Sequence, residues 1–207
     1  SALDDAAGST VVRSAAETLH GALGKDPEAA QSFVEMIERN AERLQHLVDD
    51  LLDLSRIESR AFKFNLESLE LGKVLPYLAG LVRPKAEEKS IALEVSLPES
   101  LPPCRSDRRA LEQIVTNLVD NAIKYSPERS HVHLGARADG ALVEVYVRDN
   151  GPGIAAEHLP RLFERFYRVD AGRSRETGGT GLGLSIVKHL VEAMGGTLSV
   201  QSTPGVG

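Results

Sequence analysis

The sequence predicts an α+β protein in which a two-helix hairpin is followed by an α/β sandwich. Up to about residue 60 the apolar residues recur at helical spacing, and beyond it strand-like and helix-like segments alternate. The alternation lacks the uniform strand–helix–strand spacing of a doubly wound sheet, so we expect a mixed sheet with helices on one face. We therefore divide the chain into a helical hairpin, residues 1–60, and a second domain, residues 61–207.

The hairpin is predicted from two apolar stripes. A good helix start, with a capping oxygen, a proline and an acid, lies at Asp26-Pro27-Glu28, and the helix that it opens should run to about Ser59. Asn40 takes one core position of this second helix. The first stripe is Val12, Ala16, Leu19 and Leu23; the second is Phe33, Ile37, Leu44, Leu47, Leu51 and Leu54.

The second stripe keeps a heptad rhythm over about 30 residues, more than one short helix can cover. An intramolecular coiled pair is possible, but a dimeric four-helix bundle buries more of the stripe and is favoured.

Strands and helices of the second domain are predicted from alternation, helical periodicity and turn residues. Pro76 and Pro84 lie inside one predicted helix, and Asp139-Gly140 forms a hairpin turn. The expected strands lie within 62–71 and at Ile91–Leu97, Val132–Ala136, Leu142–Val147 and Thr197–Gln201; the expected helices are 72–88, Ser106–Tyr125 and Leu182–Met194, and 165–180 is a loop.

Composition excludes several classes of function. The formal net charge is −6 and no basic stripe stands out, which argues against a nucleic-acid partner. Cys104 is the only cysteine, so no internal disulfide can form. No apolar run approaches the roughly 20 residues of a membrane span, and no signal peptide opens the sequence. Any membrane anchor is expected to lie outside this sequence.

A row of polar residues marks the helix over Ser106–Tyr125. Asn117, Asn121 and Lys124 are spaced i, i+4 and i+7 and therefore share one face. Burying two amides and an ammonium is costly unless each finds a partner. Magnesium bound to phosphates would satisfy all three, because Mg²⁺ takes oxygen ligands. A solvated polar stripe explains the same spacing equally well.

Three further clusters follow within about 70 residues. Asp149-Asn-Gly-Pro-Gly153-Ile154 comes directly after a strand, and its glycines would let the backbone approach a planar ligand; a simple turn is the alternative. Phe163–Arg168 is aromatic and basic. Gly178–Leu184 runs into a helix, whose first N–H groups suit phosphate, although a glycine cluster can also be a hinge.

Together the four clusters resemble the N, G1, F and G2 boxes of two-component sensor histidine kinases. The segments are NLVDNAIKY, DNGPGI, FERFYR and GGTGLGL, and the resemblance covers about residues 66–206. Residues 27–60, ending LVDDLLDLSRIES, resemble the second helix of the family's dimerisation domain. The resemblance implies a Bergerat ATP-binding fold, the cofactors ATP and Mg²⁺, a homodimer and a response-regulator partner. It also implies a cytoplasmic location for this part and an inner-membrane anchor on the parent protein.

The resemblance implies a role for each matching residue. Asn117 and Asn121 would hold Mg²⁺, and Lys124 and Arg168 would reach phosphate, so that Asn121, Lys124 and Arg168 form the catalytic set. Asp149 would accept from the adenine amine. The implied nucleotide-binding set is Asn117, Asn121, Lys124, Tyr125, Asp149, Gly151, Gly153, Ile154, Phe166, Thr180, Gly181, Leu182, Gly183 and Leu184.

A phosphoacceptor histidine is not identified. Residues 11–19 resemble the helix just after the family's His-Glu-x-x-x-Pro segment, which places the histidine near Leu3, yet residues 1–10 read SALDDAAGST. His20 and His46 lie on the helices without an acidic neighbour, and His131 and His133 alternate on a strand. An artificial junction at Gly8-Ser9, an omitted segment and natural loss all explain this; the composition favours an altered or truncated segment.

The leading hypothesis is a kinase that transfers the γ-phosphoryl group of Mg-ATP to a histidine, for relay to a response-regulator aspartate. An acceptor-less pseudokinase or binding module, whose nucleotide state controls a partner, is the alternative. An ATPase of the gyrase or heat-shock type is disfavoured, because Asn117 stands where those proteins carry a glutamate base.

Overall fold

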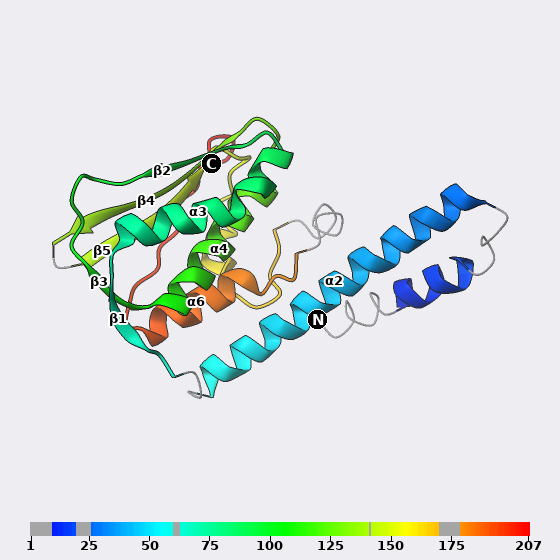
Figure 1. Cartoon of the computed structure of the whole chain (residues 1–207), viewed down its shortest axis with the longest axis horizontal. Helices are drawn as coiled ribbons and strands as arrows, with labels where there is room; N and C mark the ends of the chain where they lie inside the picture. Colours follow the sequence, from blue (N-terminus) through cyan, green and yellow to red (C-terminus); the bar gives the residue numbers. More distant parts are fainter. Residues whose placement is uncertain (1–9, 20–25, 60–62, 141, 170–178) are drawn as a thin grey trace.

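The computed structural model describes residues 10–19, 26–59, 63–140, 142–169 and 179–207. Figure 1 shows a long helical arm that projects from an α/β body. The arm is α2 (Pro27–Glu58), with a shorter helix over residues 10–19 beside its N-terminal half. The predicted start of α2 is confirmed, because the Asp26 side chain accepts a hydrogen bond from the Ala29 N–H at 3.0 Å.

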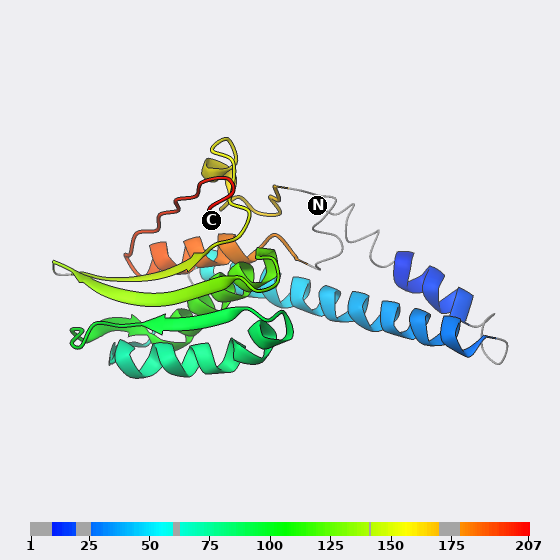
Figure 2. The same cartoon turned by 90° about the horizontal axis from the view of Figure 1, so that it is seen from above.

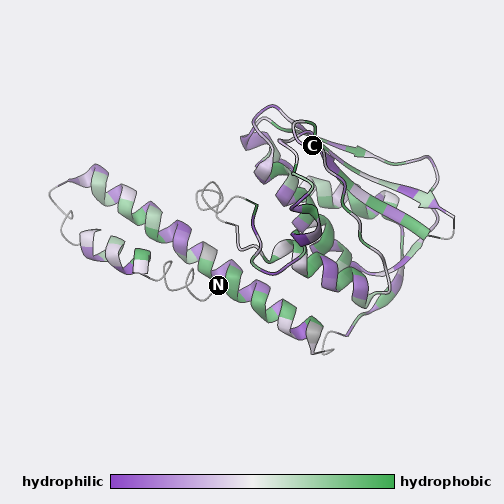
Figure 3. Ribbon diagram, turned by 180° about the vertical axis from the view of Figure 1, so that it is seen from behind, coloured by the Kyte–Doolittle hydropathy of each residue, from purple (hydrophilic) through white to green (hydrophobic). Residues whose placement is uncertain are grey.

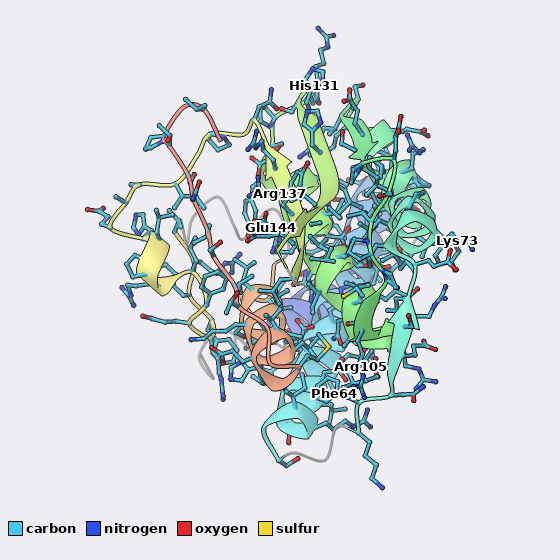
Figure 4. The ribbon with its side chains drawn as sticks, turned by 90° about the vertical axis from the view of Figure 1, so that its left-hand side faces the viewer. Phe64, Lys73, Arg105, His131, Arg137 and Glu144 are labelled. Carbon is cyan, nitrogen blue, oxygen red and sulfur yellow. The ribbon has the colours of Figure 1, made fainter. Side chains whose placement is uncertain are left out.

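The body contains a mixed sheet, as predicted. β2 (Ala92–Ser96) pairs parallel with β4 (His131–Asp139), which pairs antiparallel with β5 (Leu142–Asp149). Arg137 and Glu144 face each other across β4 and β5 and form an ion pair (Figure 4). β1 (Leu66–Leu69) and β3 (Cys104–Asp107) form a separate antiparallel pair.

Two helices cover the three-stranded sheet, and a third helix packs against one of these two (Figure 2). α3 (Leu71–Glu88) and α4 (Arg108–Tyr125) contribute Leu75 and Val119 to a core with Leu134 of β4. All three side chains are fully buried. α6 (Gly183–Ala193) packs on α4, and a short 3-10 turn, η1, spans Leu159–Arg161. None of the described helices is long and apolar enough to cross a membrane.

A second core joins the arm to the body. The C-terminal half of α2 packs against α4 and α6, and this apolar contact includes Leu54, which is 2% exposed. Other apolar residues of α2 remain exposed and form what we call the open face: Val48, Leu51 and Leu52. Green apolar positions recur along α2 in Figure 3. The prediction of one stripe facing a bundle did not include this division between body and open face.

The structure corrects one predicted helix boundary and one predicted strand. α4 begins at Arg108 rather than Ser106, because Ser106 and Asp107 pair with β1 and the Asp107 carboxylate caps α4 through the Ala110 N–H at 2.9 Å. The strand predicted at Thr197–Gln201 is not formed. Alternation alone does not make a strand, because a strand also needs hydrogen bonds to a neighbouring strand. Among the described residues β5 pairs with β4 alone, and residues 197–201 do not add a strand to the sheet. Within the predicted loop, 170–178 lies outside the described residues.

Candidate functional site

Helix α4 carries the predicted polar row at the edge of the body. Asn117, Asn121 and Lys124 are each half-buried, whereas the positions between them supply apolar core residues. The row therefore lies at the boundary of the core rather than as a fully solvated stripe. It ends where the helix ends, with the Lys124 ammonium 5.3 Å from the centre of the Tyr125 ring.

The segment Gly179–Leu184 lies across this row. A Cβ placed on Gly183 would be 3.4 Å from the Asn117 Oδ1, and one placed on Gly179 would collide with the Lys124 ammonium. The Tyr125 hydroxyl lies 3.4 Å from the same point on Gly179. Two clusters about 60 residues apart in sequence are thus brought together, and a side chain at position 179 would have to displace the Lys124 ammonium.

The N-terminus of α6 opens on the same region. Its N-cap residue Leu182 is fully buried and makes no side-chain cap, so the first N–H groups of α6 have no capping side chain among the described residues. Gly183 and Leu184, the first residues of the helix, are half-buried. An uncapped helix start, with its positive dipole end beside the Asn117 amide and with Lys124 close to the preceding Gly179, suits an anion such as phosphate.

Asp149 lies at the end of β5, near the C-terminal end of α4. Its Oδ1 accepts the Gly151 N–H at 2.9 Å, which leaves the second carboxylate oxygen for another donor. A Cβ on Gly151 would be 2.7 Å from this Oδ1 and 3.3 Å from the Ser126 Oγ. Ser126 is 2% exposed, and its hydroxyl finds no hydrogen-bond partner among the described residues. Nothing in a single sequence distinguishes this serine from an ordinary helix end.

Gly153 and Ile154 make contacts that the sequence did not predict. Gly153 has φ +68°, and the Thr203 carbonyl occupies the place of a Cβ on it. The Ile154 N–H donates to the Ser202 Oγ at 2.8 Å. In the structure the close approach at Gly153 is therefore made by the C-terminal segment of the chain.

The aromatic-basic segment is tied to the glycine segment. The Phe166 N–H donates to the Gly181 carbonyl at 2.9 Å, and both residues have positive φ, +61° and +74°. A Cβ on Gly181 would lie 3.0 Å from the Phe166 Cα, so a larger residue would push the two segments apart. Arg168 is half-buried nearby in sequence.

His158, which sequence reasoning did not select, supports the aromatic-basic segment. Its Nδ1 lies 2.6 Å from the Tyr167 hydroxyl, and the Arg161 guanidinium lies 4.2 Å from the Tyr167 ring centre. A hollow of about 430 Å³ lies elsewhere, lined by Leu51, Leu54, Ser55, Ser59 and Arg165, and contains none of the predicted site residues.

Helix α2 also contacts the site. The Thr180 hydroxyl donates to the Asp50 Oδ2 at 2.7 Å and accepts the Leu182 N–H at 3.2 Å. The Gln113 amide of α4 donates to Asp53 at 2.8 Å. Two carboxylates of the arm thus bind the body: Asp50 accepts from the glycine segment and Asp53 accepts from α4. The Thr180 hydroxyl therefore points towards α2.

We expect Asp50→Asn to stabilise the protein at neutral pH. Burial raises the pKa of the Asp50 carboxyl, and the hydrogen bond from Thr180 offsets only part of this rise. A group with a raised folded-state pKa contributes stability below its ordinary value of 3.8 and loses it as pH rises through the folded-state pKa. Asn keeps the acceptor for Thr180 without the charge. The melting temperature at pH 7 should rise by about 1–2 °C, and its fall between acid and neutral pH should become smaller.

Asp49→Asn is the control, because Asp49 is exposed and bonds only to Gln45 in the described structure. If the two substitutions gave the same pH profile, the buried Asp50 carboxylate would not be the cause.

Comparison with known proteins identifies the family of the chain. Residues 106–207 match the family model described as "Histidine kinase-, DNA gyrase B-, and HSP90-like ATPase", and residues 10–60 match "His Kinase A (phospho-acceptor) domain". The chain belongs to the two-component sensor histidine kinases. The body of this histidine kinase chain has the Bergerat fold, as the sequence predicted.

Relatives and solved structures place the chain in the same family. It is 33% identical to the sensor histidine kinase WalK of Bacillus subtilis, covering 96% of this chain and 33% of WalK. It is 38% identical to the sensor-like histidine kinase SenX3 of Mycobacterium tuberculosis, covering 90% and 45%. The chain thus spans between a third and a half of these relatives.

Two solved histidine kinases share the fold. Full-length ShkA, in complex with AMPPNP, superposes with a TM-score of 0.68 at 34% identity, covering 84% of this chain and 37% of ShkA. The Acinetobacter baumannii histidine kinase AdeS gives 0.65 at 26% identity, covering 87% and 85%.

Proposed function

We propose that this chain is the core of a sensor histidine kinase that binds Mg-ATP and transfers the γ-phosphoryl group to a histidine. Relay to a response-regulator aspartate would follow. The observation that carries the proposal is the meeting of the α4 polar row with the glycine segment and the uncapped start of α6. Phosphoryl transfer needs mostly positioning and charge neutralisation, and this arrangement offers both.

The proposed roles follow the chemistry of each group. Lys124 and the first N–H groups of α6 bind phosphate, and Arg168 approaches it from the aromatic-basic segment. Asp149 accepts from the exocyclic amine of adenine, and Tyr125 lies along the base. Gly179 lies close to the Lys124 ammonium in the described structure, so phosphate bound there would lie beside the glycine segment.

The donor set fits magnesium. Asn117 and Asn121 present amide oxygens one turn apart on α4, and the Asn117 Oδ1 already points at the phosphate-binding start of α6. The bound ion would neutralise charge on the phosphates. Asn117 cannot act as a base, so hydrolysis of the gyrase type is not favoured.

Partners are proposed on the same basis. The open face of α2 supports a homodimer, and residues 1–60 and 61–207 are proposed as the dimerisation and catalytic domains. A response-regulator receiver domain is the proposed acceptor of phosphate. A cytoplasmic position for this core, with the parent anchored in the inner membrane, is proposed from the family alone.

Asn121→Ala should abolish Mg-dependent ATP binding, because it removes a proposed metal ligand without touching the apolar core. Titration calorimetry with and without Mg²⁺ measures the loss. In parallel, γ-labelled ATP tests for acid-labile, base-stable label. We expect wild type to bind ATP but not to label itself, since no acceptor is recognisable, and to label an added family hairpin that carries His-Glu-x-x-x-Pro.

Asn40→Ala is the matched control, since the Asn40 amide bonds only to the Met36 carbonyl of α2 in the described structure. Failure of the wild-type chain to bind Mg-ATP would refute the proposed function. Binding without transfer to the added hairpin would favour the alternative of a pseudokinase or binding module. Self-labelling would direct mutagenesis to His20 and His46.

A further inference from the structure

The C-terminal end of α4 is held by a lysine from a different helix. Lys89 directly follows α3, and its ammonium donates to the carbonyls of Ile123, Lys124 and Ser126 at 2.8, 3.0 and 2.8 Å. An ammonium has three donors, and here each has a carbonyl acceptor. The last carbonyls of a helix have no partner within the helix, and the negative end of its dipole favours a cation. Lys89 therefore satisfies both needs at once.

The backbone around Lys89 closes a second connection. The Arg129 N–H donates to the Lys89 carbonyl at 3.4 Å, which ties the turn after α4 to the end of α3. Ser90 and Arg129 adopt positive φ, +55° and +61°. Non-glycine residues keep this conformation only where their surroundings fix it. The junction of α3 and α4 is therefore a strongly determined part of the fold.

The three carbonyls belong to the turn that carries candidate nucleotide-binding residues. The Lys124 carbonyl accepts from the Lys89 ammonium, while the Lys124 side chain extends its own ammonium towards Gly179. Tyr125 lies between two of the bonded carbonyls in sequence. Ser126, the third acceptor, places its side chain against Gly151 beside Asp149. The Lys89 ammonium has no donor left for a phosphate, so any effect on ligand must act through this turn.

We infer that Lys89 is a positioning residue of the nucleotide site, which fixes the last turn of α4 so that Lys124 and Tyr125 meet the ligand. The inference rests on the proposed function, because it takes Mg-ATP as the ligand. It assigns to the end of α3 a role in ATP affinity that the four sequence clusters do not contain.

Lys85, in the last turn of α3, offers a matched control. Its ammonium also bridges α3 to α4, through the Asp120 carboxylate at 3.0 Å, but it is exposed and contacts a side chain one turn before the helix end. Lys85→Met and Lys89→Met therefore remove the same chemical group, the first from one carboxylate and the second from three backbone carbonyls. Only the second releases the backbone of the candidate site.

The experiment is a double-mutant cycle on Mg-ATP affinity, with thermal unfolding measured on every variant. In the wild-type background, Lys89→Met should raise the Kd for Mg-ATP about tenfold or more, because small displacements of binding groups are costly. Lys85→Met should change this Kd less than about twofold. In a Lys124→Met background, with the weaker binding followed by nuclear magnetic resonance titration, Lys89→Met should raise the Kd no more than about threefold.

An equal Lys89→Met penalty in both backgrounds, or none in wild type, would overturn the inference. If Lys89→Met does not fold at the assay temperature, Lys89→Gln, which keeps an uncharged donor, enters the same cycle. Failure of wild type to bind Mg-ATP would refute the proposed function itself. Normal wild-type binding without coupling between Lys89 and Lys124 would refute only the positioning role.

Discussion

Asp149→Asn is expected to reverse the base preference of the nucleotide site. In the structure one carboxylate oxygen accepts the Gly151 N–H, and the other is proposed to accept the exocyclic amine of adenine. Asn can keep the bond to Gly151 but then presents its own NH₂ to that amine, donor against donor. A site built around one hydrogen bond discriminates strongly when the bond is lost, so ATP affinity should fall at least about hundredfold.

Inosine triphosphate makes this prediction specific, because it carries a carbonyl where adenine carries the amine. That carbonyl can accept from the new Asn NH₂, so the variant should bind inosine triphosphate better than ATP, whereas wild type prefers ATP. Calorimetric titration of both nucleotides into both proteins measures the four affinities. Asp139→Asn, at the exposed end of the β4–β5 hairpin, is the control. A variant that still preferred ATP would show that Asp149 does not read the base.

Much of the fold could be predicted because short sequence segments determine where its helices and turns begin and end. The start of α2 at Asp26-Pro27 and the hairpin at Asp139-Gly140 follow from short-range chemistry, and both are confirmed. α3 is helical across Pro76 and Pro84, as its apolar periodicity predicted. β3 was missed because its four residues, Cys104–Asp107, form a strand only through pairing with β1, about 40 residues earlier.

The residues of the candidate site were proposed from the sequence, whereas the contacts between them were not. Spacing placed Asn117, Asn121 and Lys124 on one face of a helix, and the structure brings the glycine segment onto that face. No pattern in the sequence indicated that Asp50 would reach Thr180, 130 residues away. Nor did any pattern connect Lys89 with the end of α4. Long-range polar contacts depend on tertiary packing, and a single sequence carries no local signal for them.

The same limit applies to the apolar stripe of α2, which the structure divides between two partners. Leu54 is 2% exposed in the contact with α4 and α6, whereas Leu51, on the open face, is 42% exposed. Leu54→Ala should therefore lower the free energy of unfolding by about 2–5 kcal/mol at any protein concentration, because it leaves a cavity. Leu51→Ala should cost about 1 kcal/mol or less in a monomer and should instead weaken a dimer.

Urea denaturation at low and high protein concentration, together with sedimentation equilibrium, separates the two effects. A dimer held by the open face makes wild-type stability rise with concentration, since association favours the folded state. Leu51→Ala should reduce this rise, and Leu54→Ala should leave its slope unchanged. If the two substitutions were equally mild at low concentration, α2 would not be packed on α4 and α6 in solution. The arm would then be free of the body, and the contacts of Asp50 and Asp53 with the site would be lost with it.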